Sequence, residues 1–398
     1  MLRRRRGHQR PGARARRRGG AIVSGTPALE ADAAAIARKV APIAAAGEEG
    51  RVNRRLIQAL GEEGLLPRLF PQRAGGSREG DISAVDLCVV RETLGRESTH
   101  VENAIAIQAL GAYPIVLAGS EAQLRRWVAP LAAGKAVAAL AITEPNAGSD
   151  AGALELRAEP DGKGYRLTGV KVFISNAPDA DVYTLFARTT PGAGTRGITA
   201  FIVPGDAERL TGVSIRLISP HPIGRIELDG VFVPRDQMLG EVDQGFKLAM
   251  RVLNLFRPSV GASVVGMAQA ALDAAIRHAA TRKAFGRPIR EFQAVSHQLA
   301  EMATRLEAAR LLVYAAAEAY DRGGTHVARR SAMAKLFATE TAQFVIDAAI
   351  QVHGAQALEE GHLLEHLYRA VRAPRIYEGT SEIQREIIAR DLFKDLPS

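Results

Sequence analysis

The chain has 398 residues, of which 47% are hydrophobic and 24% are charged. This length predicts about two to three domains of a soluble globular protein. No run of about 18 apolar residues occurs, so no membrane span is expected. The single cysteine, Cys88, excludes an internal disulfide and a cysteine-rich metal site, and its apolar neighbours predict that it fills the core.

The net charge of +9 comes entirely from the N-terminal tail. Residues 1–20 hold nine arginines and no acidic residue; without these nine, the 52 basic residues fall to 43, equal to the 43 acidic residues. We expect residues 1–26 to be disordered, because an Arg/Gly-rich segment has little to bury. Nucleic-acid binding and export are disfavoured, because the tail lacks aromatic residues and a long apolar stretch. A transit peptide, a mis-assigned start codon and an inert extension stay open.

Residues 27–137 predict an N-terminal helical domain. Alanine-rich segments with helical periodicity cover residues 29–40, 53–63, 85–95, 104–111 and 121–132. Residues 67–80 are rich in glycine and proline and predict a loop.

Residues 138–240 predict a central antiparallel β domain. Short β-branched runs separated by turn residues indicate strands at residues 165–174, 182–187, 198–203, 213–217 and 226–233. Strict alternation of strands and helices is absent, and so is a Gly-x-Gly-x-x-Gly fingerprint, which disfavours a Rossmann nucleotide domain.

Residues 241–398 predict a C-terminal helical bundle. Apolar residues recur at helical spacing across residues 291–322, Gly323 and Gly324 end that helix, and a further helix is expected at 326–353.

The segment 375–385 reads Arg-Ile-Tyr-Glu-Gly-Thr-Ser-Glu-Ile-Gln-Arg and places the carboxylate of Glu378 beside an aromatic residue and a glycine. A carboxylate among apolar groups has a raised pKa, as a base that attacks a carbon acid requires. Gly379 would let a ligand approach the backbone N–H groups. The segment also fits an ordinary loop before a helix capped by Thr380 or Ser381, and on this segment alone both interpretations stay open.

Three further segments accompany it, at residues 140–150, 281–289 and 351–354. Together, and in this order, the four segments resemble the acyl-CoA dehydrogenase family over about residues 28–395. The resemblance implies an α+β multidomain fold with an N-terminal helical domain, a central antiparallel β-barrel-like domain and a C-terminal four-helix bundle.

The resemblance also implies FAD as the cofactor. The loop Thr143–Asp150 is polar and could equally be a tight loop between domains. In the family it holds the flavin, which implies flavin contacts here from Ile142, Thr143, Gly148 and Ser149. The strand that faces the flavin carries Phe173 and Ser175, where the family usually has Trp-Ile-Thr, so the stacking plane is smaller and the hydroxyl is kept.

Other implied FAD contacts come from the helical bundle. They are Arg282, Phe285, Gln293, Gln351, Gly354, Thr380 and Glu382. In the family Arg282 meets the pyrophosphate, and it comes with the Gln351–Gly354 segment from a neighbouring subunit, which implies a homotetramer or a homodimer. A solvated helix-end charge is the alternative for Arg282. His353 is expected to be a packed helix-end histidine rather than a catalyst.

The implied reaction is α,β-dehydrogenation of an acyl-CoA thioester to a trans-2-enoyl-CoA. Glu378 is implied as the base for the α-proton and flavin N5 as the hydride acceptor, because Phe256 fills the position where one branch of the family carries its base. Ser149, Asn254, Arg257 and Gly379 are the implied substrate contacts, and no metal is expected.

An electron-transfer flavoprotein is the implied electron acceptor, and the implied location is cytoplasmic, or the mitochondrial matrix in a eukaryote. Two alternatives stay open: an oxidase on the same fold that reacts with O₂, and a flavin-bearing DNA-associated protein that uses the arginine tail. Neither the acyl group nor the choice between dimer and tetramer follows from the sequence.

Overall fold

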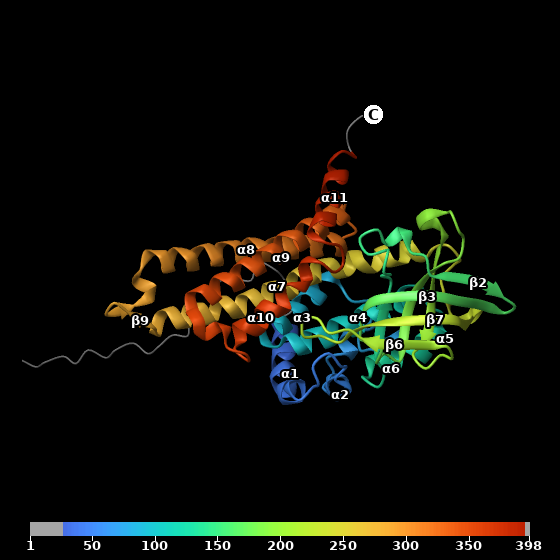
Figure 1. The fold of residues 1–398 in the computed structure, drawn as a ribbon, viewed down its shortest axis with the longest axis horizontal. Coiled ribbons are helices and arrows are strands. Elements are labelled where there is room, and N and C mark those ends of the chain that lie inside the picture. The colour runs from blue at the N-terminus through green and yellow to red at the C-terminus, as the bar shows by residue number, and fades with distance from the viewer. Residues whose placement is uncertain (1–26, 395–398) are drawn as a thin grey trace, which may run out of the picture.

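The computed structural model describes residues 27–394. Its elements follow the expected order of helices, strands and helices, with the β domain at one end of the molecule and the long C-terminal helices extending away from it (Figure 1). The disorder predicted for residues 1–26 lies outside the described residues, as do residues 395–398.

Four main helices form the N-terminal part: α1 (Pro27–Ala45), α2 (Arg54–Glu62), α3 (Ala84–Glu97) and α4 (Thr99–Ala118). The starts of α2, α3 and α4 are capped by Asn53, Ser83 and Ser98, whose side chains accept a backbone N–H. The next helical stretch is irregular, with α5 (Glu121–Gln123), a π-helical turn at Leu124–Val128 and α6 (Ala129–Ala132). Cys88 is completely buried in α3, which confirms its interpretation as a core residue.

The β domain is one sheet in the order β6-β7-β3-β2-β4-β5-β8, with β1 beside β4. Its strands are β1 (Ala138–Ala141), β2 (Arg157–Asp161), β3 (Gly164–Ser175), β4 (Val182–Arg188), β5 (Ile198–Pro204), β6 (Leu210–Ser214), β7 (Ile223–Pro234) and β8 (Met238–Leu239). Most pairings are antiparallel, as expected, but β1 and β2 both pair with β4 in parallel.

The strand predictions were incomplete. The strand expected at 213–217 lies at 210–214. The prediction assumed that the apolar residues here are buried in a strand, but Val213, Leu217 and Ile218 are exposed. Strands β1, β2 and β8 were missed. The Ala-Ala-Leu-Ala sequence of β1 carries no strand propensity and pairs only because the fold places it against β4.

The C-terminal part holds α7 (Gly245–Thr281), a small hairpin of β9 (Lys283–Ala284) and β10 (Arg287–Pro288), α8 (Gln293–Asp321), α9 (Val327–His353), α10 (Leu363–Val371) and α11 (Ser381–Leu392). Helix α7 packs against α3 at two glycines. A Cβ atom on Gly95 would lie 2.3 Å from the Ser263 carbonyl oxygen, and one on Gly266 would lie 2.0 Å from that of Glu92. These glycines therefore let the two backbones touch, which brings α3 side chains close to those of α7.

Helices α4 and α7 are long and apolar enough to cross a membrane by length and composition. Within their most apolar windows, 67% of α4 and 72% of α7 is buried inside the protein, as is usual for core helices. These two helices are therefore weak evidence for a membrane span.

Candidate active site

The predicted site residues fall into three groups in the folded chain. Glu378, Gly379 and Thr380 lie at the start of α11 beside α7 and α9. The residues of the 142–150 loop, with Phe173 and Ser175, lie in the β domain. The last group lies at the far end of the long helices (Figure 1) and consists of Arg282, Phe285, Gln293, Gln351 and Gly354.

Glu378 has a strained backbone that leads into a capped helix. Its φ angle is +52°, and that of Gly379 is +95°. Thr380 caps α11 by accepting the N–H of Ile383 at 3.3 Å, as the interpretation of this segment as a loop before a capped helix predicted. The cap is present together with the left-handed backbone of Glu378. A Cβ atom at position 379 would meet the Gln384 side-chain nitrogen at 2.5 Å. The φ angle of Gly379 therefore favours glycine here, and a side chain would also have to displace the Gln384 amide.

Side chains from three helices bind the carbonyl groups of this turn. Arg257 Nε on α7 donates to the Glu378 carbonyl at 3.1 Å, and Lys335 Nζ on α9 donates to the Gly379 carbonyl at 2.7 Å. Gln384 Nε2 on α11 donates to both carbonyls, at 3.2 and 2.9 Å. The turn is therefore held through its carbonyl oxygens, while the Glu378 side chain takes no part in these bonds.

The Glu378 carboxylate lies among buried charges. Burial raises its pKa, whereas the positive charges of Arg91, Arg257 and Lys335 act in the opposite direction. The negative charge of Glu102 adds to the rise. The Oε2 atom is out of contact with solvent, and no donor within residues 27–394 reaches it. A half-buried carboxylate with one buried, unpaired oxygen and a raised pKa is suited to take a proton from a ligand.

The sequence pointed to only one of these four charges, that of Arg257; Arg91, Glu102 and Lys335 were missed. Arg91 on α3 donates to Glu102 on α4 at 2.7 Å and to Ser259 on α7 at 2.8 Å, and both charged side chains are buried. Their only sequence signal is a pair of charges within apolar helical runs. The close approach of α3 and α7 is what brings them next to the base segment, and sequence spacing does not reveal that approach.

The predicted substrate contacts Asn254 and Arg257 lie together on α7. Arg257 is 6% exposed, and its guanidinium donates to Asn254 Oδ1 at 3.3 Å. Arg257 was expected near the carboxylate, and the structure places it on the carbonyl of Glu378 itself.

A buried ion pair anchors the 142–150 loop. Lys171 on β3 is completely buried and donates to Glu144 Oε1 and to the Ile142 carbonyl, both at 2.8 Å. The Glu144 carboxylate also accepts the backbone N–H groups of Glu155 and Leu156. Burial lowers the pKa of Lys171 to about 8. Lys171 and Glu144 fix the start of this loop to the sheet, and neither was among the predicted site residues.

The exposed part of this region presents an aromatic ring and hydroxyl groups. Phe173 is 54% exposed with a φ angle of +55°, so its ring stands out from β3. Gly148 and Ser149 are exposed, and a Cβ atom on Gly148 would meet nothing within 4 Å. An exposed aromatic ring on β3 and the hydroxyls of Ser149 and Ser175 in the same domain supply the chemistry that a flavin ring needs, so the residues present fit FAD.

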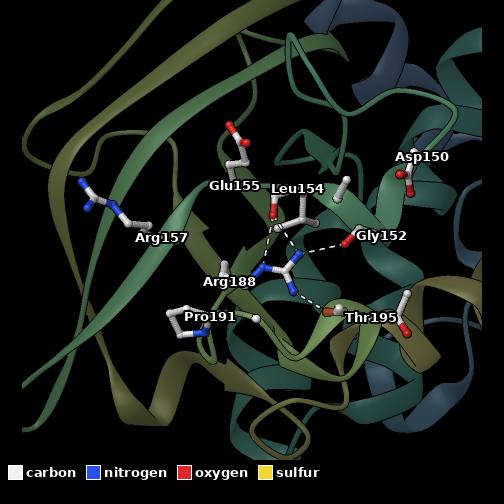
Figure 2. Close-up of a pocket in the computed structure, with 11 residues that line it drawn as sticks. Asp150, Gly152, Leu154, Glu155, Arg157, Arg188, Pro191 and Thr195 are labelled. Atoms are coloured by element: carbon white, nitrogen blue, oxygen red, sulfur yellow. Dashed lines mark hydrogen bonds between the residues drawn. The ribbon is translucent and has the colours of Figure 1, made fainter.

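A cleft of about 650 Å³ lies next to the end of this loop (Figure 2). Arg188 donates to the carbonyls of Gly152, Leu154 and Gly194, and thereby ties the two loops that form the cleft together. Its guanidinium is engaged by these carbonyls and serves the shape of the cleft.

The third group is remote from the other two within one chain. Arg282 follows α7 about 25 residues after Arg257, which corresponds to roughly 37 Å along a helix. Arg282 is exposed and Phe285 is 96% exposed. His353 ends α9, where its Nδ1 lies 2.8 Å from the Ala349 carbonyl oxygen, so it is a packed helix-end histidine. Within residues 27–394, no cluster of His, Cys, Asp or Glu is arranged to hold a metal ion.

Three family models match the chain in succession. They are "Acyl-CoA dehydrogenase, N-terminal domain" at residues 28–135, "Acyl-CoA dehydrogenase, middle domain" at 139–231 and "Acyl-CoA dehydrogenase, C-terminal domain" at 243–393.

Similar proteins cover nearly the whole chain. Cyclohexane-1-carbonyl-CoA dehydrogenase of Geobacter metallireducens is 34% identical over 90% of this chain and 94% of its own length. The caffeyl-CoA reductase-Etf complex subunit CarC of Acetobacterium woodii is 36% identical over 87% and 92%. Among solved structures, butyryl-CoA dehydrogenase from Megasphaera elsdenii has a TM-score of 0.88 at 31% identity, covering 94% of this chain and 100% of that one. PigA, solved with FAD and proline, has a TM-score of 0.88 at 28% identity, covering 94% and 98%.

Proposed function

Because this chain belongs to the acyl-CoA dehydrogenase family of oxidoreductases, we propose that it removes two hydrogens from the α and β carbons of an acyl-CoA thioester with FAD as cofactor, and that Glu378 is the base. The observation that carries this proposal is the half-buried Glu378 carboxylate, whose Oε2 atom is buried and unpaired, on a strained turn beside Arg257. The product would be a trans-2-enoyl-CoA.

The proposed role of Glu378 is to accept the α-proton of the thioester at a carboxylate oxygen. Its raised pKa makes it a stronger base than an exposed glutamate. The α-proton is weakly acidic, so the charge that develops on the thioester oxygen must be stabilised. The proposed hydrogen-bond donor to this oxygen is the backbone N–H of Glu378. The carbonyl groups of Glu378 and Gly379 accept from Arg257 and Lys335, which fixes the backbone that carries this N–H.

FAD, when bound, would supply the acceptor for the β-hydride. The proposed holding residues are the backbone at Ile142 and Thr143, the Ser149 and Ser175 hydroxyls and the face of Phe173. Two observations support this FAD site: the ring of Phe173 is exposed, and Lys171 holds the loop by donating to the Ile142 carbonyl. PigA, a protein of similar structure, was solved with FAD.

The remaining proposed FAD contacts, Arg282 and Gln351 among them, would have to come from a second copy of the chain. One chain separates Arg282 from Arg257 by roughly 37 Å of helix, which supports a shared site. We therefore propose a homo-oligomer, a dimer or a tetramer, in which Phe285 is covered by the neighbouring subunit.

The proposed electron acceptor is an electron-transfer flavoprotein, since a relative is a subunit of a caffeyl-CoA reductase-Etf complex. That relative also supports a second candidate, reduction of an enoyl-CoA, in which Glu378 returns its proton to the α carbon. Anaerobic mixing of the oxidised enzyme with acyl-CoA, and of the reduced enzyme with enoyl-CoA, compares the two directions. Fast reoxidation of the reduced enzyme when the mixture is then exposed to O₂ would instead indicate an oxidase.

The decisive experiment is the replacement Glu378→Gln. The amide keeps the size of the side chain but cannot accept the α-proton, so reduction of the flavin by acyl-CoA should fall by several orders of magnitude while FAD stays bound. A panel of short, medium, branched and cyclic acyl-CoAs, scored by flavin bleaching, identifies the wild-type substrate first. Near-normal reduction by Glu378→Gln would assign the base to another residue.

A further inference from the structure

The turn that carries Glu378 depends on outside support for its shape. A non-glycine residue with a φ angle of +52° is disfavoured unless its surroundings hold it there. Gly379 continues the left-handed path at +95°. A relaxation of this turn would move the carboxylate, because the side chain begins at the strained residue itself.

Lys335 is one of two completely buried side chains that hold this turn, and it is the charged one. Its side chain is completely buried on α9, and its ammonium group donates to the Gly379 carbonyl at 2.7 Å. Among residues 27–394, no carboxylate oxygen lies within salt-bridge distance of Lys335, whereas the equally buried Lys171 is paired with Glu144. Burying a lysine without an ionic partner is costly, so its position calls for an explanation beyond packing.

We propose that Lys335 is a positioning residue for the base: its ammonium group holds the Gly379 carbonyl, fixes the turn that aims the Glu378 carboxylate, and favours the ionised form of that carboxylate. This inference rests on the function proposed above. Helix α9 also holds both flanks of the turn, because Glu340 accepts the hydroxyl of Ser381 at 2.6 Å and pairs with Arg375 at 2.8 Å. Lys335 thus acts at the centre of a segment that α9 holds at both sides.

The charge of Lys335 acts on Glu378 together with groups from every neighbouring helix. The charged and titratable groups around the two residues are Arg91 on α3, Glu102 on α4, Arg257 on α7, Glu340 on α9, Tyr377 beside the base, and Glu382 on α11. Burial lowers the pKa of Lys335 to about 8, so it is charged at neutral pH. Removing its charge while the other groups stay in place should raise the pKa of Glu378.

The kinetic test compares Lys335→Met, which removes both donor and charge, with Lys335→Arg, which keeps both. For Lys335→Met we expect flavin reduction at saturating acyl-CoA to fall about 30- to 100-fold with KM within about threefold, because a misplaced base loses rate more than binding. In the pH profile of this rate, the acid limb should move to higher pH by about one unit. Lys335→Arg should restore the limb and most of the rate.

Three further variants separate positioning from general damage. Gln384→Met removes a neutral donor from the same carbonyls and should lower the rate without moving the acid limb. Val345→Ala creates a cavity in the buried part of α9 and should lower stability with the rate and limb unchanged. If Lys335→Met does not fold, Lys335→Gln takes its place, since it keeps a donor without the charge. A Lys335 variant that behaves like Val345→Ala would overturn the proposal.

A measurement without substrate keeps this inference separate from the proposed function. The difference in stability between a chain and its Glu378→Gln form, measured across pH, reports the pKa of Glu378. We expect this transition at higher pH in the Lys335→Met background than in the wild type. The same transition in both backgrounds would refute the role of Lys335, even if acyl-CoA turnover is confirmed. A wild type that no acyl-CoA reduces would refute the proposed function and leave this result standing.

Discussion

The two sides of the candidate site each contain one completely buried lysine, and the two lysines have different partners. Lys171, in the β domain, is paired with the buried carboxylate of Glu144 and also holds the Ile142 carbonyl. Within residues 27–394, the one hydrogen-bond acceptor of Lys335, in the helical domain, is the carbonyl of Gly379. Burial lowers the pKa of both to about 8.

This difference separates a structural clamp from a group that can influence chemistry. The charge of Lys171 is neutralised at once by Glu144, so its field does not extend far beyond the loop it anchors. The charge of Lys335 has no such partner in the part of the chain that the structure describes, and Glu378 is the carboxylate with which it interacts most strongly. Equal burial therefore leads to different roles, which follow from whether a counterion is adjacent.

The largest effect should come from Lys171→Met. This change leaves the buried, ionised carboxylate of Glu144 without its partner, which typically destabilises a protein by about 3–5 kcal/mol. The Ile142 carbonyl also loses its donor, so FAD retention should fall. Lys335→Met should destabilise the fold less, since Gln384 still donates to the Gly379 carbonyl.

Thermal melting and the flavin absorbance of the purified variants measure both effects. The double variant Lys171→Met with Glu144→Gln removes the uncompensated charge and should recover part of the lost stability. If Lys335→Met proved more destabilising than Lys171→Met, the conclusion that Lys171 has the larger structural role would be wrong.

Arg282, in the third group of residues, lies far from both buried lysines, and its replacement should have the next largest effect. If Arg282 binds the FAD pyrophosphate of a neighbouring subunit, then Arg282→Ala should lower FAD retention and thermal stability together, because FAD stabilises only the assembled form. A solvated helix-end arginine would change stability by under about 0.5 kcal/mol. Light scattering on the wild type should detect a dimer or a tetramer. A wild-type monomer that holds FAD fully would contradict the shared site.

A smaller effect should appear in the stability of Glu378→Gln. Burial raises the pKa of Glu378 in the folded state, so the folded chain holds this proton more tightly than the unfolded chain. The stability that comes from the protonated form is present at acidic pH and is lost as pH rises through the folded pKa. At neutral pH the glutamine variant should therefore be more stable than the wild type, and each pKa unit of difference is worth about 1.4 kcal/mol.

Denaturant titrations at pH 4 and pH 7 on both proteins measure this difference. The two proteins should nearly agree at pH 4, where the carboxyl group is mostly protonated in both states. A wild type that is the more stable protein at pH 7 would mean that the surrounding positive charges outweigh burial.

The general fold could be predicted from the sequence because its signals are local. Helical periodicity and β-branched runs located α1 to α4 and most strands, and the comparisons confirm the three-part fold and the family. Strand β1 was missed because its alanines favour no strand, and it pairs with β4 only through tertiary contact. The π-helical turn at Leu124–Val128 likewise has no local signature that we could identify.

The site could be predicted only where one segment carried the signal. The motif around Glu378 identified the candidate base, whose role remains a prediction. Arg91, Glu102 and Lys335 were missed, since each lies in an ordinary helical sequence and reaches the base through helix packing. The approach of α3 to α7 at Gly95 depends on two glycines far apart in the chain, and one sequence does not show that they meet.

The smallest effect should come from His353→Asn, at the end of α9. The His353 ring stacks on His278 with 4.2 Å between centroids, and its Nδ1 lies 2.8 Å from the Ala349 carbonyl oxygen, which an asparagine amide can still bind. Flavin reduction should stay within about threefold of the wild type, because His353 is far along α9 from Lys335 and the base. At pH 8 the lost ring contact should lower stability by about 0.5–1.5 kcal/mol.

The pH dependence of this variant gives the sharper test. Burial lowers the pKa of His353 below its usual 6.5, so charging the imidazole opposes folding. That penalty is absent above pH 6.5 and grows as pH falls through the window between the unfolded and folded pKa values. Asparagine does not titrate, so the variant should lose less stability than the wild type between pH 7 and pH 5, as melting curves would show. A loss of flavin reduction comparable to that of Glu378→Gln would instead make His353 part of the proton-transfer chemistry.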